Sequence, residues 1–304
     1  MPDQTSCKTS ASAQVREALE SLNLRVNKRF GQNFIVDRSV LRDIVSAADI
    51  TPTDVVIEVG PGLGILTSEL ARYAGRVIAV EVDRGLAANL ESEYRDRPNV
   101  TIVNGDILGM TTEMILSRTE QDAVSAGYKV IANLPYYITS PVLRHFLEAR
   151  MKPRMMVIMV QREVAGSITA SPGNMSLLGI SVQYFAKPKV VRKVPPGAFY
   201  PRPKISSTLL RLDVYEEPPV PVDDTQRFFR TVRAGFSARR KQVHNSLAHG
   251  LDLPVTTVAD ELESAGIDPK RRAETFSISE WAIISKRLSP YVDCPCAGQG
   301  KSGA

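Results

Sequence analysis

Short apolar runs recur along the first two thirds of the chain, and amphipathic segments lie between them. Each run has the length of a strand and ends at glycines or polar residues. The predicted strands are Val55–Val59, Val77–Val80, Val100–Val103, Val130–Ala132 and Met155–Val160, with a last strand at Ile205–Leu212. Because strands alternate with helical segments, the pattern predicts an α/β fold with a wound, parallel, Rossmann-like sheet.

Helical spacing marks the segments around and beyond these strands. Asp37 has the character of an N-cap, and the residues after it place Val40, Leu41, Ile44, Val45 and Ala48 on one helix face. The proline-rich segment 216–221 reads as a linker, and the residues beyond it follow helical patterns. We therefore predict a first domain at 26–215, a small C-terminal helical domain at 216–290, and disordered tails at 1–25 and 291–304.

Positive charge is clustered along the chain. The 304 residues carry a formal net charge of +5, yet no acidic residue lies between Glu163 and Asp213. A second segment without acids contains Arg239, Arg240 and Lys241. Clusters of this kind favour a polyanion as partner, although two ordinary solvated faces would give the same pattern.

Cysteines, histidines and hydropathy restrict the class of protein. The three cysteines, Cys7, Cys294 and Cys296, lie near the ends of the chain, so we expect no disulfide framework and a cytoplasmic location. The histidines have no ligand spacing, and we expect no metal. No secretory signal and no apolar run of about 18 residues is present, so we expect no membrane partner.

A glycine-rich turn with two acidic residues downstream indicates a nucleotide-like cofactor. Gly60, Gly62 and the adjoining Gly64 follow the first predicted strand, where glycine lets the backbone approach a ligand closely. Glu81 ends the next strand and could accept hydrogen bonds from ribose hydroxyls. Asp106 follows the third strand and could accept from an adenine amine. NAD, FAD and S-adenosylmethionine all fit the turn, but the acid on the third strand favours S-adenosylmethionine.

The sequence Asn133-Leu134-Pro135-Tyr136 follows the fourth strand and is the most specific motif in the chain. The exocyclic amine of adenine is a poor nucleophile because its lone pair is delocalised into the ring. The side-chain oxygen of Asn133 and the carbonyl of Leu134 could hold the two N–H groups out of the ring plane, while Pro135 stiffens the turn. Tyr136 could stack on the base.

Together these motifs resemble the KsgA-type ribosomal RNA adenine dimethyltransferases. The resemblance rests on the Asn133–Tyr136 motif, on Phe30-Gly31-Gln32-Asn33-Phe34, and on two basic segments at 194–204 and 239–247. It covers residues 28–288 and implies a class I methyltransferase domain, S-adenosylmethionine as methyl donor and small-subunit ribosomal RNA as partner. The chain departs from the family at Met175–Ser181, where a basic residue and a Tyr-Gly pair are usual.

The resemblance also implies individual roles. Asn33 and Ile35 would close over the cofactor, which Gly60, Glu81, Asp106 and Asn133 would line. Phe199 would be a second aromatic on the target base, although a Phe that anchors a loop in the core is the alternative. Residues expected to bind RNA are Arg202, Lys204, Arg239, Arg240 and Lys241.

These observations predict an enzyme, acting as a monomer, that dimethylates two adjacent adenosines in a loop near the 3′ end of 16S ribosomal RNA during small-subunit biogenesis. The related enzyme that methylates 23S ribosomal RNA and confers macrolide resistance is the nearest alternative. A non-catalytic RNA-binding assembly factor and a nicotinamide dehydrogenase are further alternatives. Intact Glu81, Asp106 and Asn133 argue against the former, and the Asn133–Tyr136 motif against the latter.

Overall fold

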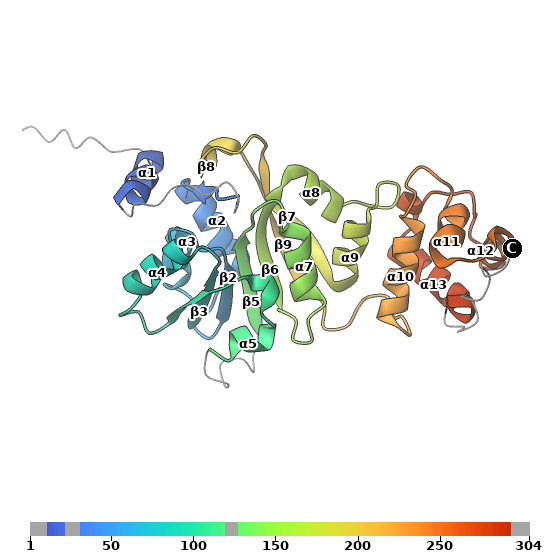
Figure 1. Cartoon of the computed structure of the whole chain (residues 1–304), viewed down its shortest axis with the longest axis horizontal. Coiled ribbons are helices and arrows are strands. Elements are labelled where there is room, and N and C mark those ends of the chain that lie inside the picture. The colour runs from blue at the N-terminus through green and yellow to red at the C-terminus, as the bar shows by residue number, and fades with distance from the viewer. Residues whose placement is uncertain (1–10, 22–30, 119–126, 293–304) are drawn as a thin grey trace, which may run out of the picture. The chain divides into compact units, whose positions relative to one another are not determined.

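The computed structural model describes residues 11–21, 31–118 and 127–292, which fall into two compact units (Figure 1). The first unit comprises Met1–Ala165 and Lys187–Val214, and the second comprises Gly166–Ala186 and Tyr215–Ala304. Cys7, Cys294 and Cys296 lie outside the described residues. None of the described helices has the length and apolar composition that a membrane crossing requires.

A seven-stranded sheet in the order β4-β3-β2-β5-β6-β9-β7 forms the centre of the first unit. Its strands are β2 (Val55–Val59), β3 (Arg76–Glu81), β4 (Val100–Asn104), β5 (Tyr128–Asn133), β6 (Met155–Gln161), β7 (Ala186–Val194) and β9 (Ser207–Val214). The predicted strands are all present. The five neighbouring strands β4, β3, β2, β5 and β6 pair in parallel. The sheet is mixed rather than wholly parallel, however, because β9 runs antiparallel to β6. Strand β7 was not predicted, because its lysines and its proline interrupt the apolar run that would indicate a strand.

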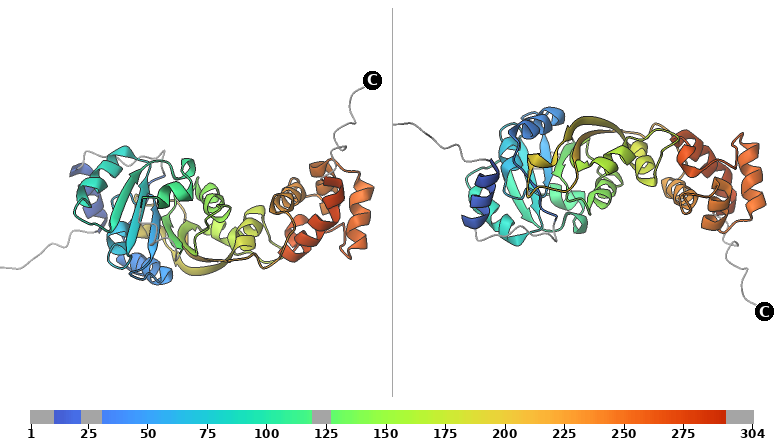
Figure 2. Two further views of the ribbon diagram at one scale, coloured as in Figure 1. Left: turned by 90° about the horizontal axis from the view of Figure 1, so that it is seen from below. Right: turned by 90° about the horizontal axis from the view of Figure 1, so that it is seen from above.

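Helices lie on both faces of this sheet (Figure 2). They are α2 (Arg38–Ala48), α3 (Ile65–Leu70), α4 (Arg84–Glu93), α5 (Thr112–Leu116) and α7 (Thr139–Leu147), with short 3-10 turns η2 (Ile107–Gly109) and η3 (Pro196–Ala198). Helix α2 confirms the predicted pattern, since Asp37 caps it and accepts a hydrogen bond from the backbone of Ser39. Its apolar face packs against β5, β6 and β9.

Helix α1 (Ala11–Ser21) occupies part of the segment for which a disordered tail was predicted. Val15 and Leu19 lie one helical turn apart and are both buried, so they form a single apolar stripe. This stripe packs with Phe34, which belongs to β1 (Phe34–Ile35). Strand β1 in turn pairs antiparallel with β8 (Phe199–Tyr200). Two buried side chains suffice to order the helix, although its composition is mostly polar.

The second unit is helical. It contains α10 (Thr225–Gly235), α11 (Val243–Leu251), α12 (Val255–Ser264), η4 (Ala273–Thr275) and α13 (Ile278–Val292), together with α9 (Leu177–Phe185), while α8 (Arg162–Ile168) spans the division. The sequence pattern assigned Gly166–Ala186 to the first domain. In the structure Gly173 and Met175 donate backbone hydrogen bonds to Glu274. Tyr184 stacks on Phe228, with ring centroids 4.9 Å apart. The Met175–Ser181 segment forms the start of α9, where Ser176 is the N-cap.

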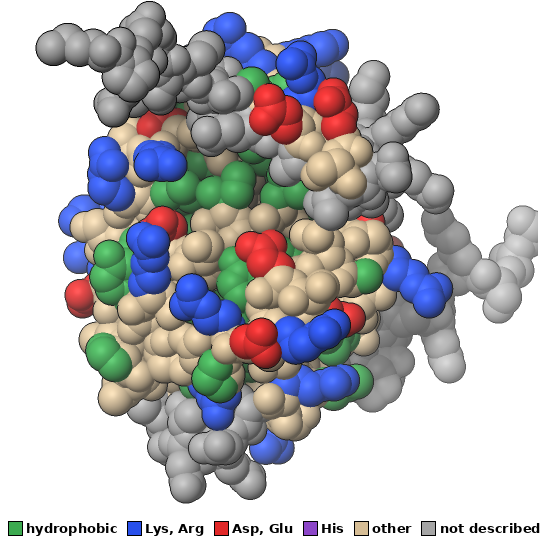
Figure 3. Space-filling model, turned by 90° about the vertical axis from the view of Figure 1, so that its left-hand side faces the viewer, with side chains coloured by type: hydrophobic (Ala, Val, Ile, Leu, Met, Phe, Trp, Pro, Cys, Tyr) green, Lys and Arg blue, Asp and Glu red, His purple; other side chains and the backbone are tan. Residues whose placement is uncertain are grey.

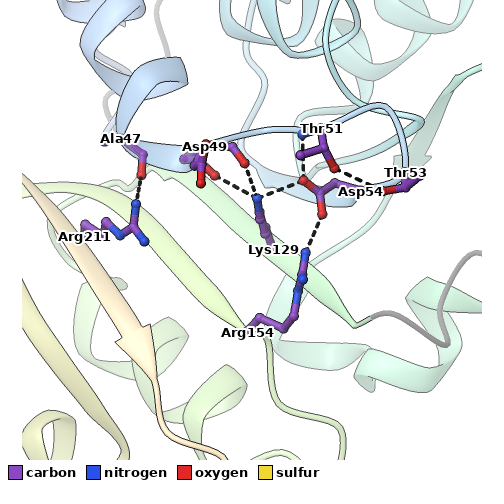
Figure 4. A network of polar contacts seen from close by, with 9 residues as sticks. Ala47, Asp49, Thr51, Thr53, Asp54, Lys129, Arg154 and Arg211 are labelled. Atoms are coloured by element: carbon purple, nitrogen blue, oxygen red, sulfur yellow. Dashed lines mark hydrogen bonds and ion pairs between the residues drawn. The ribbon is translucent and has the colours of Figure 1, made fainter.

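A buried ion-pair network connects the C-terminal end of α2 to the sheet, near the first residues of β2 and β5 (Figure 4). Nζ of Lys129, on β5, donates to Oδ2 of Asp54 at 2.8 Å and to the carbonyl oxygens of Ala48 and Asp49. Arg154 donates to the other carboxylate oxygen of Asp54. Burial alone would raise the pKa of Asp54, but the hydrogen bonds from Lys129 and Thr51 outweigh it and lower that pKa. The network therefore satisfies a buried ammonium and the C-terminal carbonyls of α2 together.

Replacing Lys129 with Met should lower the free energy of unfolding by about 3–5 kcal/mol, because Asp54 and two carbonyl oxygens would lose a buried partner. Urea denaturation followed by circular dichroism measures this change. The matched control is Arg144→Ala, which breaks an exposed pair with Glu148 and should cost at most about 0.5 kcal/mol. Equal losses in the two variants would contradict the stated role of the network.

Candidate active site

One cavity at the carboxyl ends of β2, β3 and β5 gathers every residue predicted for the cofactor and the target base. This is the edge at which open α/β sheets bind ligands. The predicted residues that line it are Asn33, Ile35, Gly60, Gly62, Glu81, Asp106, Asn133, Leu134, Pro135, Tyr136 and Phe199. All of them belong to the first unit.

The glycine turn forms one wall of the cavity. Gly60, Gly62 and Gly64 have φ values of 72°, 60° and 76°, a conformation that L side chains rarely adopt. A Cβ atom on Gly62 would also lie 2.8 Å from the ring of Phe34. Glycine is thus required at position 62 both by the backbone and by the close approach of the β1 segment.

Glu81 lies at the end of β3 and is 4% exposed. Its Oε2 accepts from the backbone nitrogen of Gly62 at 3.0 Å, and its Oε1 accepts from that of Asp83 at 2.9 Å. Burial raises the pKa of this carboxyl. The carboxylate therefore fixes the glycine turn, and each oxygen keeps a second lone pair for a hydroxyl of a ligand.

Asp106 begins the turn after β4 and is exposed on the cavity. Its Oδ1 accepts from the backbone nitrogen of Leu108 at 3.0 Å, so this side chain caps η2. The structure shows the cap, and the position on the cavity leaves Oδ2 available to an amine.

The side chain of Asn133 is oriented by a hydrogen bond that it donates to a residue far away in the sequence. Its Nδ2 donates to the carbonyl oxygen of Asn33 at 2.7 Å. The side chain of Asn33 in turn donates to the carbonyl of Gly31 at 2.9 Å. Because Nδ2 is engaged, the Oδ1 atom of Asn133 is the group left to accept a hydrogen bond from a ligand.

Two aromatic side chains line the cavity beside Asn133. The hydroxyl of Tyr136 lies 3.0 Å from Oγ of Ser207, at the start of β9. Phe199 is 3% exposed and belongs to the apolar core, where it pairs in register with Ile35. Phe199 thus anchors its loop in the core, and it also forms part of the cavity wall.

Glu58 and Tyr137 line the same cavity, but the sequence analysis assigned neither a role. Glu58 is 1% exposed, and neither of its carboxyl oxygens has a hydrogen-bond partner among the described residues. Burial, with the nearby charge of Glu81, raises the pKa of Glu58 to about 8. Tyr137 has an exposed fraction of 59%. The apolar run Val55–Val59 already indicated a buried strand around Glu58, but the missing partner of its carboxyl and the exposure of Tyr137 depend on the tertiary structure.

The residues predicted to bind RNA are exposed, and they do not all lie in one unit. Arg202 and Lys204 follow β8 in the first unit. The others, Arg239, Arg240 and Lys241, lie between α10 and α11 in the second. Within residues 11–21, 31–118 and 127–292, no group of His, Cys, Asp and Glu has the arrangement of a metal site.

Replacing Glu58 with Gln should flatten the dependence of folding stability on pH. The raised pKa means that the folded chain holds a proton that the unfolded chain releases, so stability falls as pH rises from about 4.5 to about 8. Urea unfolding at a series of pH values measures the effect, which should reach at most about 5 kcal/mol at the alkaline end. The exposed Glu91→Gln should leave the wild-type profile unchanged. Identical profiles for wild type and Glu58→Gln would contradict the assignment.

Comparison with solved structures supports the fold. The crystal structure of the 23S rRNA methyltransferase ErmE has a TM-score of 0.65 and 28% identity, covering 84% of this chain and 100% of that one. A dimethyladenosine transferase from Plasmodium falciparum gives a TM-score of 0.71 at 22% identity, over 84% of this chain and 96% of that one. The first unit and the helices α10–α13 thus follow a class I methyltransferase fold with a C-terminal helical region.

The curated sequences include relatives of higher identity than these two structures. The ribosomal RNA small subunit methyltransferase A of Dehalococcoides mccartyi is 45% identical over 287 residues, which cover 94% of this chain and 96% of the relative. The protein of the same name from Alkaliphilus metalliredigens is 41% identical over 93% of this chain and 98% of the relative. The model of the ribosomal RNA adenine dimethylase family matches residues 23–289. The chain therefore belongs to the ribosomal RNA adenine dimethylase family.

Proposed function

We propose that this protein transfers methyl groups from S-adenosylmethionine to the exocyclic amines of two adjacent adenosines in a loop near the 3′ end of small-subunit (16S) ribosomal RNA. The product is dimethyladenosine, and the reaction belongs to the biogenesis of the small subunit. The observation that carries this proposal is the orientation of Asn133, which leaves its oxygen as an acceptor on a cavity that Tyr136 also lines.

The chain's own groups fit S-adenosylmethionine. Glu81 would accept from the ribose hydroxyls and Asp106 from the adenine amine of the cofactor, while the open space at Gly60 would let the cofactor approach the protein backbone closely. The raised pKa of Glu58 favours the protonated form of its carboxyl, which supplies a buried hydrogen-bonding group without a partner on the same cavity. When bound, S-adenosylmethionine supplies an electrophilic methyl group. No metal is needed for this chemistry.

Asn133 and Leu134 would activate the target amine. Oδ1 of Asn133 and the carbonyl oxygen of Leu134 accept the two N–H groups, which draws the nitrogen lone pair out of conjugation with the ring. The acceptor oxygens of Asn133 and Leu134 would direct this lone pair at the methyl group that bound S-adenosylmethionine supplies, with the neutral thioether as leaving group, and would pass one amine proton to water. Tyr136 and Phe199 hold the base by stacking, worth about 1–3 kcal/mol for each base.

The same groups are compatible with a second methyl transfer. After the first methyl is added, the amine keeps only one N–H group, and one acceptor is left unused. Leu134 is 2% exposed, so leaving its carbonyl unpaired would cost about 1–3 kcal/mol. The apolar wall of Leu134 and the two aromatic rings would accommodate the added methyl.

RNA binding would involve both units. Arg202 and Lys204 in the first unit, and Arg239, Arg240 and Lys241 in the second, would contact phosphates. We infer in addition that the protein works as a monomer in the cytoplasm. Methylation of 23S ribosomal RNA is the second candidate function. It is favoured only by the likeness to ErmE at 28% sequence identity, whereas the small-subunit relatives have sequence identities of up to 45%.

Incubation with undermethylated small subunits and methyl-labelled S-adenosylmethionine tests the proposal. Mass spectrometry of the digested RNA should find dimethyladenosine in the small-subunit RNA, with monomethyladenosine only as an intermediate. Asn133→Ala should slow transfer roughly a hundredfold or more, by analogy with loss of an oxyanion-hole donor, because its acceptor acts as the amine attacks.

Each other outcome of this experiment has a definite meaning. Label in large-subunit RNA alone, when both subunits are offered, would favour the second candidate function. Monomethyladenosine as the end point would contradict the proposed second transfer. No transfer by the wild type would overturn the proposed function, and transfer by Asn133→Ala at the wild-type rate would overturn the role of that side chain.

A further inference from the structure

Strand β7 (Ala186–Val194) lies at the edge of the seven-stranded sheet and carries an unusual density of positive charge. Lys187, Lys189 and Lys193 are all exposed. They belong to the segment without acids for which the sequence predicted a polyanion partner, but no motif and no cavity residue gives them an individual contact. The residues of an edge strand are held in place by pairing with the neighbouring strand. The backbone positions of these lysines are therefore fixed relative to the sheet.

The three lysines share one face of the strand. Side chains alternate along a strand, so odd-numbered and even-numbered residues of β7 point to opposite faces. On the even-numbered face, Arg192 donates to Asp43 on α2, and Val194 is buried in the core. The lysines therefore point away from α2, and Lys187 and Lys189 stand about 6.6 Å apart along the strand. We call Lys187, Lys189 and Lys193 the lysine row.

The charges of the lysine row are not neutralised by neighbouring carboxylates. The arginines nearby have acidic partners, since Arg192 pairs with Asp43 and Arg211 pairs with Asp213. The salt bridges of the described residues do not include the lysine row, which lies in the segment without acids between Glu163 and Asp213. By contrast, positive and negative side chains are interspersed over the face of the molecule drawn in Figure 3.

The strand leads to the edge of the sheet at which the cavity lies. β7 ends at Val194, which packs in the same core cluster as Ala198 and Phe199. The chain then enters β9 at Ser207, which pairs with Gln161 at the carboxyl end of β6 and contacts Tyr136. The lysine row thus extends from this edge of the sheet on the segment that delivers Phe199 to the cavity wall.

We propose that the lysine row binds the phosphate backbone of the RNA strand adjacent to the target adenosine. A row of three cations on one face of a strand, with no acid among them, fits a polyanionic chain better than a protein strand. Lysines on an edge strand also discourage pairing with another sheet, and exposed Val190 and Val191 show that this edge needs such protection. A charge of either sign gives that protection, whereas only a positive charge binds phosphate. The proposal rests on the proposed function.

Reversing the charges separates the two roles of the lysine row. The variant Lys187→Glu/Lys189→Glu/Lys193→Glu keeps the edge charged and removes the phosphate contacts. The matched control is Arg95→Glu/Arg97→Glu/Arg150→Glu, which makes the same change in net charge at exposed positions elsewhere on the first unit. A labelled single-stranded RNA with two adjacent adenosines is titrated with each full-length protein at several salt concentrations.

The lysine-row variant should lose affinity for this RNA roughly tenfold or more, and the log–log slope against salt should fall by about 2. The control should retain most of the wild-type slope. Calorimetry with S-adenosylmethionine should give the same affinity in both variants and the wild type. If the triple variant does not fold, single Lys189→Glu should reduce the slope by about 0.7.

Equal losses in the two variants would overturn the proposal, because net charge alone would then explain the effect. An unchanged slope in the lysine-row variant would overturn it as well. Either result can occur while the wild type methylates small-subunit RNA normally, so failure of this inference is distinguishable from failure of the proposed function. Wild-type RNA affinity in a monomeric Glu variant would leave only the edge-protection role, which the glutamates preserve.

Discussion

The hydrogen bond from Nδ2 of Asn133 to the carbonyl oxygen of Asn33 joins two segments that are 100 residues apart in sequence. It fixes which end of the Asn133 amide points to the cavity, and it holds the β1 segment over the glycine turn. Phe34 then lies against Gly62, and β1 pairs with β8, which brings Phe199 to the cavity. The contact between Asn33 and Asn133 therefore connects the proposed acceptor to the segment that carries the cofactor wall and, through β8, one aromatic ring.

Charge is distributed in opposite ways inside the cavity and on the surface. The cavity wall contains Glu58, Glu81 and Asp106, and burial raises the pKa of the first two. Glu58 is buried without a hydrogen-bond partner, and its raised pKa favours the neutral form, which limits the cost of its burial. The edge strand β7, in contrast, carries only positive charge. An acidic cavity beside a basic edge suits a cationic methyl donor together with a polyanionic substrate.

The sequence predicted the elements that local patterns define. Apolar runs located the strands, and turn residues after them located the carboxyl-end groups, because parallel strands place those ends at one edge. Features that depend on tertiary contacts were not predictable. The strand β7 lacks an apolar alternation, and α1 is ordered by two buried side chains. The segment 166–186 belongs with the C-terminal helices through backbone bonds to Glu274, which no local pattern encodes.

The rate of a single turnover with Asn133→Asp tests the central claim most directly. An aspartate keeps an acceptor oxygen and nearly the same shape, but it has no N–H group to donate to the carbonyl of Asn33. If that hydrogen bond orients the acceptor, methyl transfer to undermethylated small subunits should fall roughly a hundredfold, close to Asn133→Ala, while S-adenosylmethionine still binds. Transfer by Asn133→Asp near the wild-type rate would contradict the account, because an acceptor oxygen alone would then suffice.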